Sequence, residues 1–251
     1  MKFRSKLILV AAALMMSGNS FAETVHAAVA ANFTTAMKEL VTQFEQTSEH
    51  KVKLSFGSSG KIFAQIRNGA PFQIFLSADQ AKPQALEEAG LTVPGSRFTY
   101  AVGALVLWSA KPGLVDSKYS RLKTGEFNKL AFANPKVAPY GAAAMEILQA
   151  LNLTELTAGK WVQGENIAQT YQFVASGNAD LGFVALSQVM DKGHIKTGSS
   201  WIVPRELYSP IRQDAVLLTR GQDSIAAKAL LKYLTSDTAR AIIHSYGYTT
   251  Q

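Results

Sequence analysis

The chain has no cysteine among its 251 residues. This absence excludes disulfide bonds, metal sites built on thiolates and a lipid anchor attached to an N-terminal cysteine. Histidine is scarce, and His26, His50, His194 and His244 do not have the spacing of metal ligands. Lysine and arginine are scattered rather than gathered in a stripe, so the positive charge gives no support to nucleic-acid binding.

Long hydrophobic runs are lacking as well, and no stretch of the chain has the length needed to cross a bilayer. The N-terminal apolar run, residues 7–16, is short. It follows three basic residues and precedes the small residues of Ser20-Phe21-Ala22. This order is typical of a secretory signal peptide, so we expect residues 1–22 to be removed by cleavage after Ala22. A retained N-terminal anchor is the alternative.

Removal of this segment, which carries three basic residues and no acidic one, lowers the formal net charge from +7 to +4. Export without a lipid anchor predicts a soluble protein of a Gram-negative periplasm with no membrane insertion.

Strands alternate with helices along the chain, which predicts an α/β fold whose parallel sheets are covered by helices. Alternating or continuous apolar residues predict strands at residues 24–31, 51–56, 73–77, 100–108, 130–134, 161–163, 180–185 and 214–218. Apolar residues at helical spacing predict helices at residues 33–47, 62–67, 81–89, 142–151, 167–174, 224–234 and 238–246.

A chain of this length forms one domain or two lobes. The segments at about residues 92–99 and 204–213 are the best candidates for crossings between two lobes. We expect a first lobe of residues 23–101 and 214–251 and a second of residues 102–213, each with a mostly parallel sheet. The apolar run 100–108 predicts one strand that is buried on both faces.

The stretch Phe56-Gly57-Ser58-Ser59-Gly60-Lys61 joins a strand to a helix through small residues. The first amides of such a helix are unpaired, and together with the helix dipole they favour an anion. A nucleotide-binding loop is excluded, because the required Gly and Ser/Thr positions hold Ser55 and Ile62. A hydrolase nucleophile elbow around Ser59 fails at Lys61. A turn with a capping serine and no ligand is the remaining alternative.

Four strand-to-helix turns have this character: Asn32, Ser58-Ser59-Gly60, Pro139-Tyr140-Gly141 and Glu165-Asn166-Ile167. Two belong to each expected lobe, and ligands of open α/β sheets bind at the carboxyl ends of strands. A cleft between the lobes could therefore direct several helix starts at one small anion. By position, Asn32 is expected to be an N-cap.

The motifs Ala30-Ala31-Asn32-Phe33-Thr34, Phe56–Gly60, Gly69–Asp79, Pro139–Gly141, Glu165–Ile167 and Leu181–Val184 closely resemble those of the periplasmic molybdate-binding proteins of ABC importers. The likeness runs from about residue 24 to the C-terminus. It implies the type II solute-binding fold, in which two α/β lobes are joined by crossing strands. It also implies an interlobe cleft that binds the tetrahedral oxyanions molybdate and tungstate through neutral groups.

The resemblance implies four ligand positions: Asn32 and Ser59 with side-chain and backbone donors, and Tyr140 and Ile167 with backbone N–H groups. Ser58 and Gly60 are additional candidates. Asn32 stands where many relatives have Ser, and Ala185 stands where some supply a tyrosine hydroxyl. Whether the hydroxyl of Tyr140 replaces that contact is open. Gln73 replaces a common Asp and is interpreted as structural, and Asp79 is expected to cap the following helix.

Donors alone suit a fully deprotonated dianion, because its desolvation must be offset by hydrogen bonds and it has no proton to donate. Glu165 is the only carboxylate near the matched set, and Lys61 is expected to be a solvated lysine. The resulting hypothesis is a monomeric, non-enzymatic binding protein with no cofactor other than its ligand, molybdate or tungstate. Its partner would be an inner-membrane ABC permease. Sulfate, phosphate or chromate binding and a secreted serine hydrolase are the alternatives.

Overall fold

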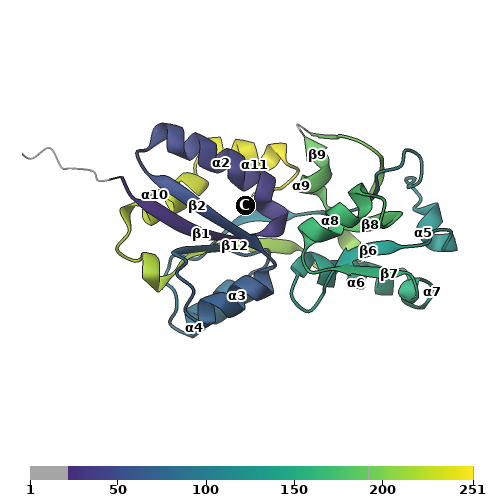
Figure 1. Cartoon of the computed structure of the whole chain (residues 1–251), viewed down its shortest axis with the longest axis horizontal. Helices are drawn as coiled ribbons and strands as arrows, with labels where there is room; N and C mark the ends of the chain where they lie inside the picture. Colours follow the sequence, from purple (N-terminus) through teal and green to yellow (C-terminus); the bar gives the residue numbers. More distant parts are fainter. Residues whose placement is uncertain (1–21, 192, 251) are drawn as a thin grey trace, which may run out of the picture.

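The structure is a computed structural model that describes residues 22–191 and 193–250. The expected signal peptide lies outside these residues, apart from Ala22. Two five-stranded sheets lie side by side along the long axis of the molecule, each covered by helices (Figure 1). We call the sheet nearer the N-terminus, with its helices, the first lobe and the other the second lobe.

The sheet of the first lobe has the order β2-β1-β3-β12-β4. Its strands are β1 (Thr24–Ala30), β2 (Lys51–Gly57), β3 (Ile74–Leu76), β4 (Phe98–Gly103) and β12 (Ile211–Leu217). The N-terminal strands β1, β2 and β3 pair in parallel, whereas β12 pairs antiparallel with β3 and β4. The sheet is therefore mixed, because β12 enters it from the second lobe.

Both faces of this sheet are covered by helices, as the alternation of strands and helices along the chain predicts. Val25, Ala27 and Val29 pack with α2 (Thr34–Thr47), α10 (Ile225–Leu234) and α11 (Asp237–Ser245). Ala28 faces the opposite side, where α3 (Ser59–Arg67) and α4 (Ala81–Glu88) pack. The 3₁₀ turns η1 (Ala31–Phe33) and η3 (Thr219–Gly221) complete the lobe.

The second lobe repeats this plan with the sheet order β11-β5-β8-β6-β7. Its strands are β5 (Leu105–Ser109), β6 (Leu130–Ala133), β7 (Trp161–Gly164), β8 (Leu181–Ala185) and β11 (Ser199–Ile202). Its larger helices are α6 (Pro139–Ala150) and α8 (Ile167–Ala175). The short elements are α5 (Ser120–Thr124), α7 (Thr154–Ala158), α9 (Leu186–Val189), β9 (Met190–Asp191), β10 (His194–Ile195) and η2 (Arg205–Leu207).

The expected single strand at residues 100–108 is wrong. The run forms two strands in different sheets, since β4 ends at Gly103 and β5 begins at Leu105. This is also where the chain first crosses between lobes, rather than at about residues 92–99. An apolar run buried on both faces looks alike in either sheet, so its composition gave no sign of the crossing.

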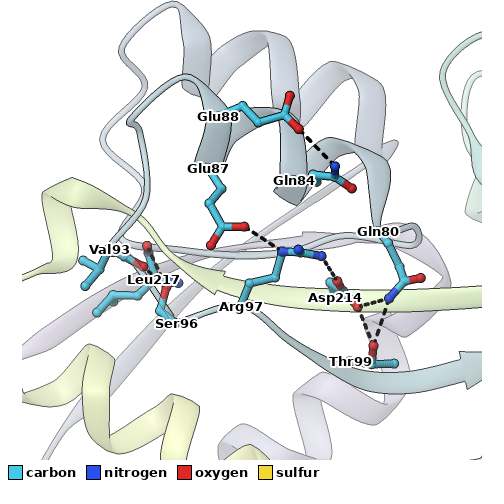
Figure 2. Close-up of polar contacts among 10 residues, drawn as sticks. All are labelled: Gln80, Gln84, Glu87, Glu88, Val93, Ser96, Arg97, Thr99, Asp214 and Leu217. Atoms are coloured by element: carbon cyan, nitrogen blue, oxygen red, sulfur yellow. Dashed lines mark hydrogen bonds and ion pairs between the residues drawn. The ribbon is translucent and has the colours of Figure 1, made fainter.

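The return strand β12 is anchored in the first lobe by Asp214, whose side chain is 2% exposed. Its carboxylate accepts hydrogen bonds from Thr99 Oγ1 at 2.7 Å and Gln80 Nε2 at 3.1 Å, and it pairs with Arg97 at 3.0 Å. Figure 2 shows that Arg97 also contacts Glu87, so the cluster ties β12 to α4 and to the strand that precedes the crossing. The expected limits of the lobes, residues 23–101 with 214–251 and residues 102–213, remain a prediction.

The remaining strands and the longer helices are confirmed, with ends displaced by a few residues. The largest displacements are at the starts of α3, α6 and β12, each of which begins three residues earlier than expected. The helix α6 begins at Pro139 because proline suits the first helical position. Within residues 22–191 and 193–250, the structure contains no helix with the length and apolar character of a membrane span.

Candidate functional site

A small cavity lies between the lobes where the starts of four helical segments meet. Its wall comes from η1 and α3 of the first lobe and from α6 and α8 of the second. The lining residues are Ala30, Ala31, Asn32, Gly57, Ser58, Ser59, Ala78, Ala138, Pro139, Tyr140, Asn166 and Ile167. The structure thus brings Asn32, Ser59, Tyr140 and Ile167 together, with Ser58 beside them.

The four backbone N–H groups of Asn32, Ser59, Tyr140 and Ile167 all lie in the first turn of a helical segment, where no preceding turn supplies an acceptor. None of them donates a hydrogen bond to a described residue outside its own helix. Two other residues limit the donor set, since Pro139 has no N–H and the side chain of Asn166 caps α8 by accepting from Ala168 and Gln169. This cap leaves the N–H of Ile167 free.

The two serines that precede α3 differ in their contacts. Ser59 is 1% exposed, and its Oγ accepts a hydrogen bond from Ala78 N–H at 2.9 Å, so its own hydroxyl proton remains available. Ser58 is 3% exposed, and its buried hydroxyl has no hydrogen-bond partner among the described residues. It also makes no cap bond to the helix. A buried hydroxyl without a partner is costly, which marks Ser58 as a group suited to a ligand.

Asn32 does not have the role that its position suggested. It lies inside η1, and neither η1 nor α2 has a side-chain cap. Its Nδ2 donates instead to Gln213 Oε1 at 2.7 Å and to Tyr248 Oη at 3.0 Å, and lies 3.5 Å from Tyr140 Oη. The expected N-cap is wrong, because Asn32 lies inside η1 rather than before it, and its side chain extends to buried partners from distant parts of the chain.

These partners form a neutral network below the cavity, which we call the Asn32 network. It consists of Asn32, Tyr100, Tyr140, Ser187, Gln213 and Tyr248. Burial raises the pKa of Tyr248 to about 12. Burial also raises the pKa values of Tyr100 and Tyr140 well above the ordinary tyrosine value, so all three phenols stay neutral. Sequence reasoning missed Gln213 and Tyr248. The one available signal was a pair of polar residues, Gln213-Asp214, before an apolar strand.

The lobes touch around the cavity. Gly60 N–H donates to Val137 O at 2.9 Å, and a Cβ on Gly60 would lie 2.9 Å from Val137 Cα. Gly60 is therefore not part of the cavity wall, and its amide is used in the contact between lobes. Lys61 Nζ pairs with Glu165 Oε1 across the cleft at 2.7 Å, with about half of each side chain exposed.

No charged side chain is among the described residues that line the cavity. The described chain also has no group of three His, Asp or Glu residues that could hold a metal ion. The cavity measures about 10 Å³, room for about one water molecule. A larger groove of about 330 Å³ adjoins it, sharing Ala78, Ala138 and Pro139 and containing Asp79, Lys82, Glu146 and Arg212.

Three further expectations concern residues around the site. Gln73 Oε1 accepts from His26 N–H at 2.9 Å, in agreement with a structural role. Asp79 Oδ1 accepts from Lys82 N–H at 3.1 Å, so its carboxylate pairs with an amide of the first turn of α4 from the position before Gln80, the N-cap. Ala185 is buried at the end of β8 and brings no hydroxyl to the site. The hydroxyl of Tyr140 accepts hydrogen bonds within the Asn32 network instead.

Comparisons with known proteins agree with this architecture. The model of the family described as bacterial extracellular solute-binding protein matches residues 25–249. The chain is 55% identical over 247 residues to the molybdate-binding protein ModA of Azotobacter vinelandii, covering 98% of each sequence. It is 52% identical over 227 residues to the molybdate-binding protein ModA of Rhodobacter capsulatus, covering 90% of this chain and 88% of that protein.

Among solved structures, the periplasmic molybdate-binding protein of Azotobacter vinelandii superposes with a TM-score of 0.88 at 40% sequence identity. The match covers 90% of this chain and 99% of that one, so it includes both lobes. The two-lobe α/β fold predicted from the sequence is therefore confirmed, as is the resemblance on which part of that prediction rested.

Proposed function

Because the chain belongs to the bacterial extracellular solute-binding protein family, we propose that it captures a tetrahedral oxyanion, molybdate and also tungstate, between its lobes. It then delivers this ion to an ABC permease of the inner membrane. The two curated relatives that share more than half of its sequence are both named molybdate-binding proteins, which supports this choice of ion.

The observation that carries the proposal is a cavity wall made of uncharged donors. Four unpaired N–H groups and the hydroxyls of Ser58 and Ser59 surround a space with no charged side chain. Each N–H group stands at the positive end of a helical segment, which favours negative charge. A buried dianion requires many such bonds, and hydrogen bonds to a charged group are stronger than those between neutral groups.

The same donors favour an anion without a proton. A hydrogen phosphate ion would need an acceptor, and the nearest carboxylate candidate, Glu165, does not line the cavity and is paired with Lys61. The side-chain oxygen of Asn166 is occupied in capping α8. Fully deprotonated dianions are therefore bound in preference to protonated ones.

Lobe movement admits and encloses the ion. Both lobes contribute to the wall of the small cavity, so the lobes must part to admit the ion. Two donor sets come from each lobe, and the liganded closed state gains contacts that the open state lacks. A hydrolase is not favoured, because no histidine among the described residues lines the cavity with Ser59. The protein acts as a monomer in the periplasm after removal of residues 1–22, and no bond of the ion is made or broken.

A thermal-shift panel of sodium molybdate, tungstate, sulfate, phosphate and chromate tests the ion. A ligand of the folded state present at about 1,000 times its Kd adds about 4 kcal/mol to the free energy of unfolding. We expect molybdate and tungstate to raise the Tm by several degrees and phosphate to leave it unchanged. A Tm raised by sulfate alone would contradict the choice of molybdate. Hydrolysis of an ester substrate would favour the alternative function, that of a serine hydrolase.

Two alanine substitutions test the cavity. Asn32→Ala should weaken molybdate binding, and unaltered affinity would count against this site. Ser58→Ala should weaken binding about tenfold or more, since a hydrogen bond to a charged group contributes about 1.5–3 kcal/mol. Ser48→Ala is the matched control, because Ser48 Oγ is likewise buried without a partner but lies outside the cavity.

A further inference from the structure

A buried glutamine of the returning strand β12 joins the two halves of the cavity wall. Gln213 is 0% exposed. Its Oε1 accepts from Asn32 Nδ2 at 2.7 Å, and its Nε2 donates to Tyr140 Oη at 3.2 Å. Asn32 belongs to the first lobe and Tyr140 to the second. One side chain on a strand that connects the lobes thus holds one cavity residue from each.

Tyr140 takes part in both the cavity and the network through different groups. Its backbone N–H lies in the first turn of α6 at the cavity, whereas its hydroxyl reaches past the cavity to Gln213 and Asn32. Gly103, the last residue of β4, leaves room for this hydroxyl, because a Cβ at that position would overlap its oxygen. Insertion of the Tyr140 side chain therefore requires that α6 be docked against the crossing strands.

A second contact across the lobes strengthens the arrangement. Ser187 in α9 donates from its hydroxyl to the carbonyl oxygen of Asn32 at 3.0 Å. Tyr248 Oη lies 2.9 Å from both Asn32 O and Ser187 Oγ. The backbone of the same C-terminal segment is tied to β4, since Val102 N–H donates to Thr249 O at 2.7 Å. Asn32 is thus held through its amide and its carbonyl.

We propose that Gln213 is a positioning residue: it orients Asn32 at the cavity and receives the Tyr140 hydroxyl when the second lobe closes. Closure and completion of the anion site are thereby one event. This inference rests on the proposed function, since it assumes that Asn32 and Tyr140 N–H bind the oxyanion. When the lobes part, the Tyr140–Gln213 bond is lost, and Gln213 keeps Asn32 in place through its Oε1.

The test compares two variants with a matched control. Gln213→Met keeps the length of the side chain but removes both polar contacts. Tyr140→Phe removes only the hydroxyl and keeps the backbone N–H at the cavity. Tyr246→Phe is the control, because the Tyr246 hydroxyl donates to Glu39 Oε2 at 2.6 Å within the first lobe and belongs neither to the Asn32 network nor to the cavity wall.

Molybdate affinity, dissociation rate and lobe separation are measured on each protein. Since the chain has no cysteine, Glu88→Cys on α4 and Glu155→Cys on α7 give one dye pair across the lobes. We expect Gln213→Met and Tyr140→Phe to raise Kd about tenfold, mainly through faster dissociation. Tyr246→Phe should stay within about twofold of the wild type while losing a similar amount of thermal stability.

The outcomes separate the two proposals. If the wild type does not bind molybdate, the proposed function fails, and the lobe separation of the ligand-free proteins still tests Gln213. A greater separation in Gln213→Met and Tyr140→Phe than in Tyr246→Phe would then support its role. If both variants match Tyr246→Phe in affinity, dissociation rate and lobe separation, the inference is overturned. Should Gln213→Met fail to fold, Tyr140→Phe carries the test alone.

Discussion

Gln213 and Asp214 are consecutive residues of β12, yet their side chains lie in two polar clusters of opposite character. The pairing of β12 with β4 changes register between them. Gln213 belongs to the neutral Asn32 network, which joins both lobes. Asp214 belongs to a charged cluster with Gln80, Glu87, Arg97 and Thr99, all of which lie in the first lobe (Figure 2).

The comparison shows that the charged contacts lie within one lobe, whereas the neutral contacts join the two lobes. The partners of the buried Asp214 carboxylate all come from one lobe, so they stay in place when the lobes part. Breaking a buried ion pair by losing one partner leaves an uncompensated charge, which is strongly unfavourable. The buried contacts that join the two lobes are neutral hydrogen bonds, which cost less to exchange with water. They also leave no fixed negative charge beside an anion cavity.

The largest expected effect follows from breaking the charged cluster. Asp214→Asn removes the partner of Arg97 inside the first lobe, so we expect a loss of about 2–3 kcal/mol in the free energy of unfolding. The Tm should fall by about 5–10 °C while molybdate affinity stays within about twofold. Glu87→Gln is the control, because Glu87 pairs with the same Arg97 but is 33% exposed, and should cost less than about 1 kcal/mol. A large loss of affinity without a change of Tm would contradict the separation of the two clusters.

The next effect concerns the neutral network at alkaline pH. Burial raises the pKa of Tyr248 in the folded protein to about 12, above the ordinary value of 10.0. The stabilisation from the neutral phenol is complete below pH 10 and is lost as the pH rises through 12, because the unfolded chain releases its proton first. Tyr248 should thus account for about 2 kcal/mol of the stability lost between pH 9 and pH 12.

Chemical denaturation across this pH range provides the measurement. Tyr248→Phe should lose less stability than the wild type on going from pH 9 to pH 12, although it starts from a lower value. Parallel pH curves for the two proteins would show that Tyr248 does not titrate in this way.

The longer elements were predictable from the sequence because each shows a full period of apolar residues. The 3.6-residue stripe of α2 is present in the structure, and the alternating Val52, Leu54 and Phe56 of β2 pack against the core of the first lobe. Short helices such as α5 and α9, with five and four residues, contain too few positions to show a period. The 100–108 run was misread because burial on both faces removes the alternation that would have identified each sheet.

The site was only partly predictable for a different reason. Strand-to-helix turns can be found from local sequence, and the resemblance supplied Tyr140 and Ile167, which would act through backbone N–H and leave no side-chain signal. The partners of Asn32, however, are 108, 181 and 216 positions away. No local pattern shows such contacts, so Asn32 looked like a cap and Gln213 looked like part of a crossing segment.

The smallest expected effect concerns the one apparent exception to the comparison, the ion pair of Lys61 and Glu165 that does join the lobes. Its side chains are 53% and 51% exposed, so water solvates both charges whether the lobes are together or apart. Exposed pairs contribute roughly 0–1 kcal/mol, and salt screens them. Lys61→Met should therefore change molybdate affinity less than about threefold at 0.15 M salt, and the difference from the wild type should shrink at 1 M salt.

The variant Glu165→Gln removes the opposite charge. It distinguishes an effect of the ion pair itself from a long-range attraction between Lys61 and the anion. If the pair itself matters, both variants weaken binding, whereas if Lys61 only attracts the anion, Glu165→Gln strengthens it. A tenfold loss in both variants that persists at 1 M salt would mean that charged contacts also control closure, and the neutral character of the Asn32 network would then need another explanation.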